Sequence, residues 1–142
     1  MRTEYVSVFF YGLFMDTTLL ASRGIWPTET TVGYVDGYNL HIGERATLLP
    51  EAGGRAYGVV MTIKPDDVAA LYSDASVADY VADTLVVELP GNRQVRAACY
   101  SLPAAKLTGT NPAYAAALLD LASWLEFPEH YLARIREVTG NA

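Results

Sequence analysis

One stretch near the start of the chain decides the fold: YVSVFFYGLFMD, residues 5–16. Its first half, residues 5–10, is rich in β-branched and aromatic side chains and ends at Tyr11-Gly12. Such a run predicts a buried strand followed by a sharp turn. Asp16 then precedes a Thr-Thr-Leu-Leu-Ala run, which is typical of a short helix with an N-terminal cap. The expected order is therefore strand, loop, helix.

Apolar runs punctuated by glycine follow. They predict short strands over residues 31–35, 38–42, 46–49 and 56–63. Asp36-Gly37 favours a two-residue hairpin turn, and Gly53-Gly54 favours the next reversal. A later hairpin is expected from residues 84–89 and 94–102. Together these runs predict six or seven strands.

Three more helices are predicted from their first residues. Pro65, followed by two aspartates, starts a helix that ends at Leu71, since proline and acidic residues suit the first helical turn. Asn111-Pro112 starts a helix through Trp124, and Pro128 precedes a last helix over residues 129–138. The expected fold class is α+β, a mixed β-barrel with surrounding helices, in a single domain over residues 1–142.

The amino-acid composition indicates which classes of binding partner and which cellular compartment to expect. The 142 residues are 51% apolar and 18% charged, a balance typical of a globular domain. Sixteen acidic and ten basic residues give a net charge of −6. This charge argues against nucleic acid and anionic membranes as partners. The pattern of a secretory signal is missing at the start of the sequence, so we expect a cytoplasmic protein.

Metal and nucleotide cofactors are not expected. His41 and His130 are far apart in sequence, and neither forms a cluster of metal-ligand spacing with Cys99 or acidic residues. The sequence contains no glycine-rich phosphate loop and no dinucleotide fingerprint. The single cysteine excludes an internal disulfide and is expected to be buried.

The loop after the first strand is the candidate wall of a ligand cavity, because small barrels often hold one ligand at the mouth. Its residues are Tyr11, Gly12, Leu13 and Phe14. Unpaired backbone N–H groups of this loop, with the dipole of the following helix, suit a carboxylate or other anion. The alternative is a plain tight turn whose side chains pack in the core.

Two residues elsewhere carry polar groups that suit a ligand. Arg45 follows Glu44 on a strand-like stretch and suits bidentate pairing with a substrate carboxylate. Tyr100 lies on a late strand, where its hydroxyl would be a hydrogen-bond donor. The alternatives are an exposed strand edge for Arg45 and core packing for Tyr100.

Several segments resemble the gamma-glutamyl cyclotransferase-like family in their order and spacing. Residues 9–15, FFYGLFM, are similar to the family's first-strand motif, in which Ser or Thr follows Tyr-Gly. Further similar segments are residues 32–40, residues 56–60, the helix before Leu71, residues 80–87 and residues 111–131. The resemblance therefore covers most of the chain.

The resemblance implies an activity and a set of site residues. In the family, the first loop holds a γ-glutamyl group, and a glutamate after the middle helix acts as general acid/base while the substrate's own amine attacks the γ-carbonyl. The products are 5-oxoproline and a released amine. The implied substrate-binding residues are Tyr11, Gly12, Leu13, Phe14, Arg45, Tyr80 and Tyr100. No cofactor is implied.

Two positions depart from the family pattern. Counting forward from Leu71 puts Ala75 at the glutamate, whereas counting back from Tyr80 puts Asp74 there. The second register is preferred because strands are pinned more firmly than joints between helices and loops. Asp74 is therefore the candidate acid/base, with Asp79 as a fallback. Leu13 replaces the family's hydroxyl residue and predicts a more apolar pocket.

Three functions follow from this reading. The first is a cyclotransferase-like enzyme acting on a small γ-glutamyl amine or related amide. The second is a small-molecule or partner-binding module that has lost the acid/base, because aspartate is one methylene shorter than glutamate. The third is an interaction role through exposed aromatic side chains of Trp26, Trp124 or Tyr131. The sequence leaves the oligomeric state open.

Overall fold

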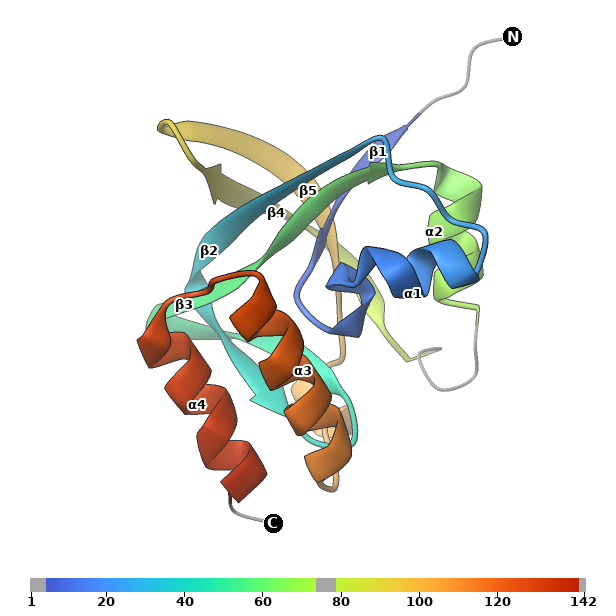
Figure 1. The fold of residues 1–142 in the computed structure, drawn as a ribbon. Coiled ribbons are helices and arrows are strands. Elements are labelled where there is room, and N and C mark those ends of the chain that lie inside the picture. Colours follow the sequence, from blue (N-terminus) through green and yellow to red (C-terminus); the bar gives the residue numbers. More distant parts are fainter. Residues whose placement is uncertain (1–4, 74–78, 141–142) are drawn as a thin grey trace, which may run out of the picture.

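The computed structural model describes residues 5–73 and 79–140. Its strands are β1 (Val6–Phe10), β2 (Glu29–Ile42), β3 (Ala46–Ile63), β4 (Val81–Leu89) and β5 (Arg93–Ser101) (Figure 1). Its α-helices are α1 (Thr17–Ser22), α2 (Pro65–Leu71), α3 (Pro112–Trp124) and α4 (Glu129–Gly140). Two 3₁₀ turns are η1 (Leu13–Met15) and η3 (Ala104–Lys106).

The strands form a closed barrel in the order β1-β3-β2-β4-β5. β1 is antiparallel to β3 and parallel to β5, so it joins the two ends of the sheet and makes the barrel mixed. The α+β class and the mixed barrel are thus confirmed. The described part of the chain has five strands, where the sequence predicts six or seven.

The predicted number of strands is too high because the sequence favours turns at Asp36-Gly37 and at Gly53-Gly54. Asp36-Gly37 does not reverse the chain, because β2 runs straight through it and turns only after Ile42, which pairs with Ala46. The pairing register shifts at this point instead. Gly37 and Gly53 have φ values of +87° and +80°, the left-handed conformation that a bulge requires as much as a turn does. The two predicted hairpins are therefore one long hairpin with an irregularity in its middle.

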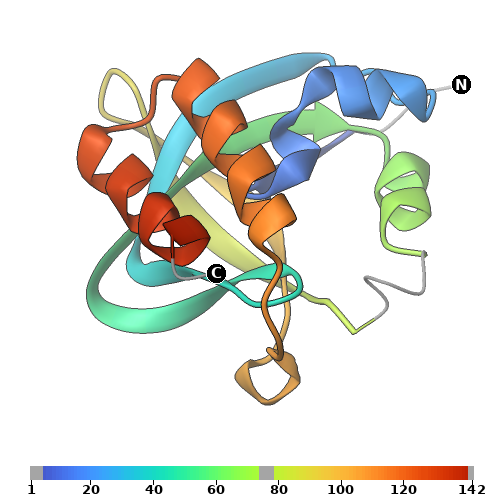
Figure 2. The ribbon, with the colours of Figure 1, turned by 60° about the horizontal axis from the view of Figure 1, so that its bottom comes forward.

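The four predicted helices are present, and two of them begin at a capping side chain. The Asp16 carboxylate accepts hydrogen bonds from the backbone N–H groups of Thr18 and Leu19 at the start of α1. The Asn111 side chain accepts one from Tyr114 N–H, at 3.0 Å, at the start of α3. Figures 1 and 2 show α3 between α4 and α1, with α2 at the far end of the molecule from α4. None of the described helices is long and apolar enough to cross a membrane.

Two paired glycines allow the strands to approach closely enough to close the barrel. Gly33 on β2 is the register partner of Gly58 on β3. A Cβ atom at Gly58 would lie 2.3 Å from the carbonyl oxygen of Phe10, and one at Gly33 would lie 2.7 Å from that of Glu88. Both distances are shorter than atoms of this size tolerate. Any side chain at these positions would push β1 or β4 away.

β1 is buried on both of its faces. Val8, Phe9 and Phe10 are at most 2% exposed, although successive residues of a strand point to opposite sides.

Cys99 on β5 is buried too, as expected, and burial raises the pKa of its thiol to about 12. Such a thiol stays protonated and unreactive at neutral pH.

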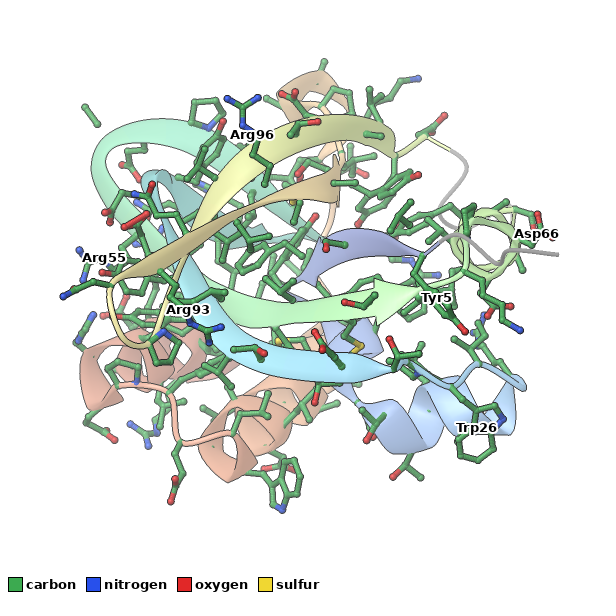
Figure 3. All side chains as sticks on the ribbon, turned by 90° about the horizontal axis from the view of Figure 1, so that it is seen from above. Tyr5, Trp26, Arg55, Asp66, Arg93 and Arg96 are labelled. Carbon is green, nitrogen blue, oxygen red and sulfur yellow. The ribbon has the colours of Figure 1, made fainter. Side chains whose placement is uncertain are left out.

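The exposed aromatic residues only partly match the sequence expectation. Trp26 and Trp124 are 72% and 77% exposed, whereas Tyr131 is 3% exposed. Tyr131 packs edge-on against Tyr57, with ring centroids 5.0 Å apart, because its α4 face lies on the barrel. The expectation that Tyr131 takes part in an exposed interaction surface is therefore wrong. Trp26 projects from the surface near α1 (Figure 3).

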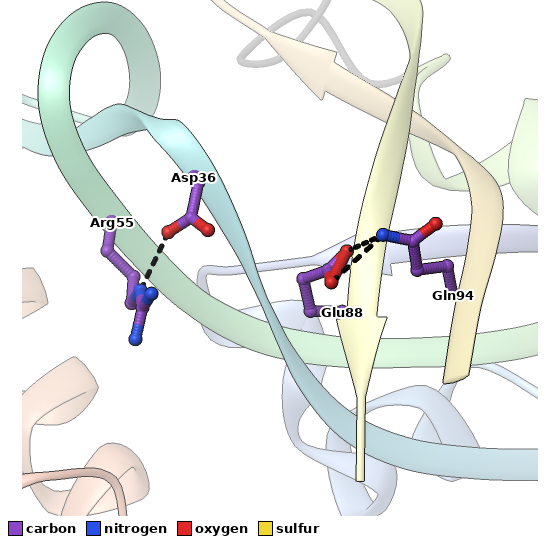
Figure 4. Close-up of polar contacts among 4 residues, drawn as sticks. All are labelled: Asp36, Arg55, Glu88 and Gln94. Carbon is purple, nitrogen blue, oxygen red and sulfur yellow. Dashed lines mark hydrogen bonds and ion pairs between the residues drawn. The ribbon is translucent and has the colours of Figure 1, made fainter. Parts of the chain in front are cut away.

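Pairs of polar side chains link neighbouring strands on the outside of the barrel. The Arg55 guanidinium donates to the Asp36 carboxylate at 2.7 Å, and the Gln94 amide donates to the Glu88 carboxylate at 2.7 and 3.0 Å (Figure 4). Each pair joins register partners of neighbouring strands. Solvent screens exposed pairs of this kind and they contribute little, so the core carries the stability.

Thr47 links β3 to the end of β5 inside the core. Its buried hydroxyl donates to the carbonyl of Leu102 at 2.7 Å and accepts from the N–H of Leu102 at 2.8 Å. Thr47→Val keeps the shape of the side chain but leaves the buried N–H and carbonyl of Leu102 without these hydrogen bonds. We expect the free energy of unfolding, measured by urea denaturation, to fall by about 2–4 kcal/mol, since each buried group left unpaired costs about 1–3 kcal/mol.

Thr47→Ser is the matched control. It keeps the hydroxyl and removes one methyl group, for an expected loss of about 1 kcal/mol. A Thr47→Val variant as stable as Thr47→Ser would show that the two hydrogen bonds do not hold β5 in place.

Candidate functional site

A cavity of about 300 Å³ lies where β1 ends. It is bounded by the loop from β1 into α1, by the turn between β2 and β3, by the end of α2 and by the start of α3. The lining residues are Phe10, Tyr11, Gly12, Leu13, Phe14, Leu19, Arg23, Arg45, Ala46, Leu71, Tyr72, Tyr80 and Tyr114. This volume is at the lower end of the range for small-molecule sites and suits a ligand of dipeptide size.

The four residues of the predicted loop all line this cavity. The loop is held from outside by Tyr114 of α3, whose hydroxyl accepts a hydrogen bond from Leu13 N–H at 3.4 Å. A Cβ atom at Gly12 would lie 2.5 Å from the Tyr114 hydroxyl oxygen, so the close approach requires glycine. The expected contribution of the α1 dipole is reduced, because Asp16 already occupies the first N–H groups of that helix.

Tyrosine hydroxyls supply most of the neutral polar groups of the cavity. Tyr80, just before β4, donates to the carbonyl of Ala46, and Tyr11 donates to the carbonyl of Tyr100 at 2.7 Å. Burial raises the pKa of Tyr11, Tyr80 and Tyr114, and the Arg45 charge only partly offsets this for Tyr80 and Tyr114. These phenols are therefore neutral at physiological pH. The Tyr114 hydroxyl accepts from the loop and keeps its own proton for a ligand.

Aromatic rings form one continuous wall. Phe14 packs edge-on against Phe10 and Tyr72, with centroids 5.9 and 5.7 Å apart. Tyr72 in turn stacks on Tyr100, with centroids 4.0 Å apart and planes 12° apart. Tyr100, a predicted substrate-binding residue, is not among the described lining residues and contacts the cavity wall only through Tyr72. Edge-to-face and offset contacts of this kind fix the shape of the wall.

Two arginines supply the only charges among the described lining residues. Arg45 comes from the β2–β3 turn, and Arg23 from the end of α1, where its guanidinium carbon lies 5.6 Å from the Phe14 ring centroid. Neither forms an ion pair with a described residue. A protein of net charge −6 therefore presents positive charge at this cavity, which favours an anionic ligand.

The predicted acid/base candidates are not among the described lining residues. Asp74 lies outside the described residues, although Tyr72 and Tyr80 on either side of it in sequence both line the cavity. Asp79 is exposed and does not line it. No group of three or more His, Cys, Asp or Glu side chains within residues 5–73 and 79–140 is placed to hold a metal ion.

Sequence reasoning missed a part of this site. Arg23 and Tyr72 cap the C-terminal ends of α1 and α2, and no local pattern distinguishes them from surface or core residues. Tyr114 lies in the first turn of α3. The capping Asn111 places Tyr114 in that turn through its backbone N–H, but the direction of the Tyr114 ring depends on the packing of α3.

A second hollow, of about 430 Å³, lies between the β2–β3 bulge and α4. Its lining is mostly polar and includes Glu51, Arg55 and His130. Its described lining contains none of the predicted substrate-binding or acid/base residues. The cavity at the end of β1 is therefore the better candidate for the functional site.

Comparison with known proteins identifies the family of this chain. Residues 8–125 match the family described as gamma-glutamyl cyclotransferase, AIG2-like. The chain belongs to this family. No curated protein matches the sequence significantly. The matched range begins in β1 and ends just after α3, so it includes every described element that lines the cavity.

Solved structures share the fold of this gamma-glutamyl cyclotransferase family member. A protein named gamma-glutamyl cyclotransferase superposes with a TM-score of 0.73 at 17% identity, over 94% of this chain and 87% of that one. YkqA from Bacillus subtilis gives 0.78 at 20% identity, over 96% and 54%. A yeast gamma-glutamyl cyclotransferase specific to glutathione gives 0.67 at 15% identity, over 97% and 96%. At these identities the likeness establishes the fold alone.

The buried tyrosines of this family member predict how it responds to alkali. Burial raises the pKa of Tyr11, Tyr72, Tyr80, Tyr114 and Tyr131 above the ordinary value of 10.0. The folded state therefore keeps protons that the unfolded chain releases, and this stability is complete below pH 10 and is lost as the pH rises above it. Phenolate absorbance should show these tyrosines ionising only as the protein unfolds.

The unfolded protein in concentrated urea is the reference for this titration. We expect all of its tyrosines to ionise together near the ordinary value. If the native protein gave the same curve while its circular dichroism stayed unchanged, the tyrosines would not be buried as described.

Proposed function

We propose that the protein is a γ-glutamyl cyclotransferase that acts on a small γ-glutamyl amide and releases 5-oxoproline. The observation that carries this proposal is the convergence of three groups on one cavity at the end of β1: the Gly12-Leu13 loop, the Tyr114 hydroxyl and the Arg45 guanidinium. Membership of the family supports the same activity.

The γ-glutamyl group fits the part of the cavity beside Gly12. Its α-carboxylate would pair with Arg45, which has no ion-pair partner among the described residues. Its γ-carbonyl oxygen would accept from the Tyr114 hydroxyl, which is neutral and keeps its proton. Donors that are already fixed before the reaction stabilise the negative charge that grows on this oxygen.

The reaction is an internal acyl transfer. The α-amine nitrogen of the substrate forms a bond to the γ-carbonyl carbon, and the bond from that carbon to the leaving nitrogen breaks. One proton moves from the attacking to the leaving nitrogen, so the step consumes neither water nor a redox partner. An acid/base group within about 3 Å of the amine would carry this proton.

Asp74 is proposed for this role. It lies outside the described residues, and the support for it is indirect. It falls between Tyr72 and Tyr80, which both line the cavity, and the described lining residues supply no carboxylate of their own. A base is needed because the amine attacks only in its unprotonated form.

A non-catalytic binding module is the second candidate function. One observation favours it: Leu13 stands where the family's first-strand motif has a hydroxyl residue. Such a module would bind γ-glutamyl compounds in the same cavity without converting them.

Release of 5-oxoproline from γ-glutamyl amino acids and amines tests the proposal. We expect the parent protein to release it, and Asp74→Asn to lower kcat by about 10²–10⁴-fold, the range for loss of a general acid/base. Asp66→Asn is the matched control, because it removes an exposed carboxylate of α2 that does not line the cavity. We expect the control to keep the parent rate.

Two results would contradict parts of this proposal. Equal rates for Asp74→Asn and the parent would exclude Asp74 as the acid/base. Binding of γ-glutamyl compounds without any release of 5-oxoproline would contradict the proposed enzyme activity and support the non-catalytic binding module.

A further inference from the structure

The two arginines of the cavity lie at different places in it. Arg45 belongs to the β2–β3 turn, next to Ala46, whose carbonyl accepts the Tyr80 hydroxyl, and its charge acts on Tyr80 and Tyr114. It therefore lies on the side of the Gly12 loop. Arg23 closes α1 and lies over Phe14, where the aromatic wall begins. Each arginine is thus available to a separate anionic group.

The surroundings of Arg23 indicate what kind of group it meets. Phe14 packs against Tyr72, and Leu19, one helical turn before Arg23 on α1, also lines the cavity. The cation therefore has apolar neighbours. Arg23 is exposed, and its guanidinium carbon lies 5.6 Å from the Phe14 ring centroid, within the range of a cation–π contact. Its donors remain free among the described residues for a carboxylate above the wall.

The number of charges distinguishes between γ-glutamyl compounds. A γ-glutamyl amino acid carries two carboxylates, one on the glutamyl group and one on the amino acid that is released. A γ-glutamyl amine lacks a carboxylate on the carbon next to the amide nitrogen. Two separated cations, with no described carboxylate between them in the lining, match the first class.

We propose that Arg23, held over Phe14, is a specificity-determining residue that binds the carboxylate of the released amino acid. This inference rests on the proposed cyclotransferase function. It assigns the substrate class as γ-glutamyl amino acids whose apolar side chain lies on the wall of Phe14 and Tyr72. Arg45 then binds the carboxylate of the glutamyl group, and Arg23 binds the carboxylate of the released amino acid.

A pair of compounds isolates the second carboxylate. γ-Glutamylphenylalanine and γ-glutamylphenylalanine amide have the same size and the same aromatic ring, and they differ only in the charge at the position assigned to Arg23. We expect the parent protein to prefer the acid by about 10- to 100-fold in kcat/KM, the range for a hydrogen-bonded charge pair. The preference should appear mainly in KM, since the contact is the same in the ground state and the transition state.

Arg23→Gln should abolish this preference. We expect its kcat/KM for the acid to fall to that for the amide, while the value for the amide stays that of the parent. Arg23→Lys keeps the charge without the planar fork and should retain a part of the preference. Arg96→Gln is the control: Arg96 is an exposed arginine on β5, on the far side of the barrel from α1 (Figure 3).

Failure of this inference is distinguishable from failure of the proposed function. Turnover of both compounds by the parent at equal efficiency, or a preference unchanged in Arg23→Gln, would overturn the role of Arg23 and leave the cyclotransferase in place. If neither compound is turned over, calorimetric binding of the same pair decides: a preference for the acid that disappears in Arg23→Gln supports Arg23. Equal binding of the two compounds, or binding of neither, overturns its role.

Discussion

Closure of the barrel around β1 is the constraint on which the rest of the structure depends. β1 joins β3 on one side and β5 on the other, and Val8, Phe9 and Phe10 are buried on both faces. The strands can approach this closely only because Gly58 leaves room for the carbonyl of Phe10. The same closure fixes where β1 ends, and therefore where the chain must leave the barrel as an open loop.

The candidate site follows from that exit point. The loop after β1 lies under α3, and the absence of a side chain at Gly12 lets the Tyr114 hydroxyl reach it. The β2–β3 turn contributes Arg45 to one side of the cavity and the end of α1 contributes Arg23 to another. A rigid apolar wall with a few converging polar groups is the usual form of a small-molecule site. Here the charges select anions in an otherwise acidic protein.

The elements that the sequence predicted correctly are those specified locally. Asp16 and Asn111 cap their helices within three residues, so α1 and α3 could be placed from short patterns. The long β2–β3 hairpin could not, because Gly37 permits a turn and a bulge equally well, and the register of the partner strand decides between them. The loop residues of the site are contiguous and were predictable. Arg23 and Tyr114 were not, because only the packing of α1 and α3 brings them to the loop.

The most direct test of this account is a crystal structure of the protein with N-glutaryl-phenylalanine, which lacks the attacking amine and so cannot cyclise. The account predicts that the glutaryl chain lies beside Gly12, with its carboxylate on Arg45 and its amide carbonyl at the Tyr114 hydroxyl. Binding in the polar hollow of Glu51, Arg55 and His130, or with the glutaryl group away from the β1 loop, would contradict the assignment of the functional site.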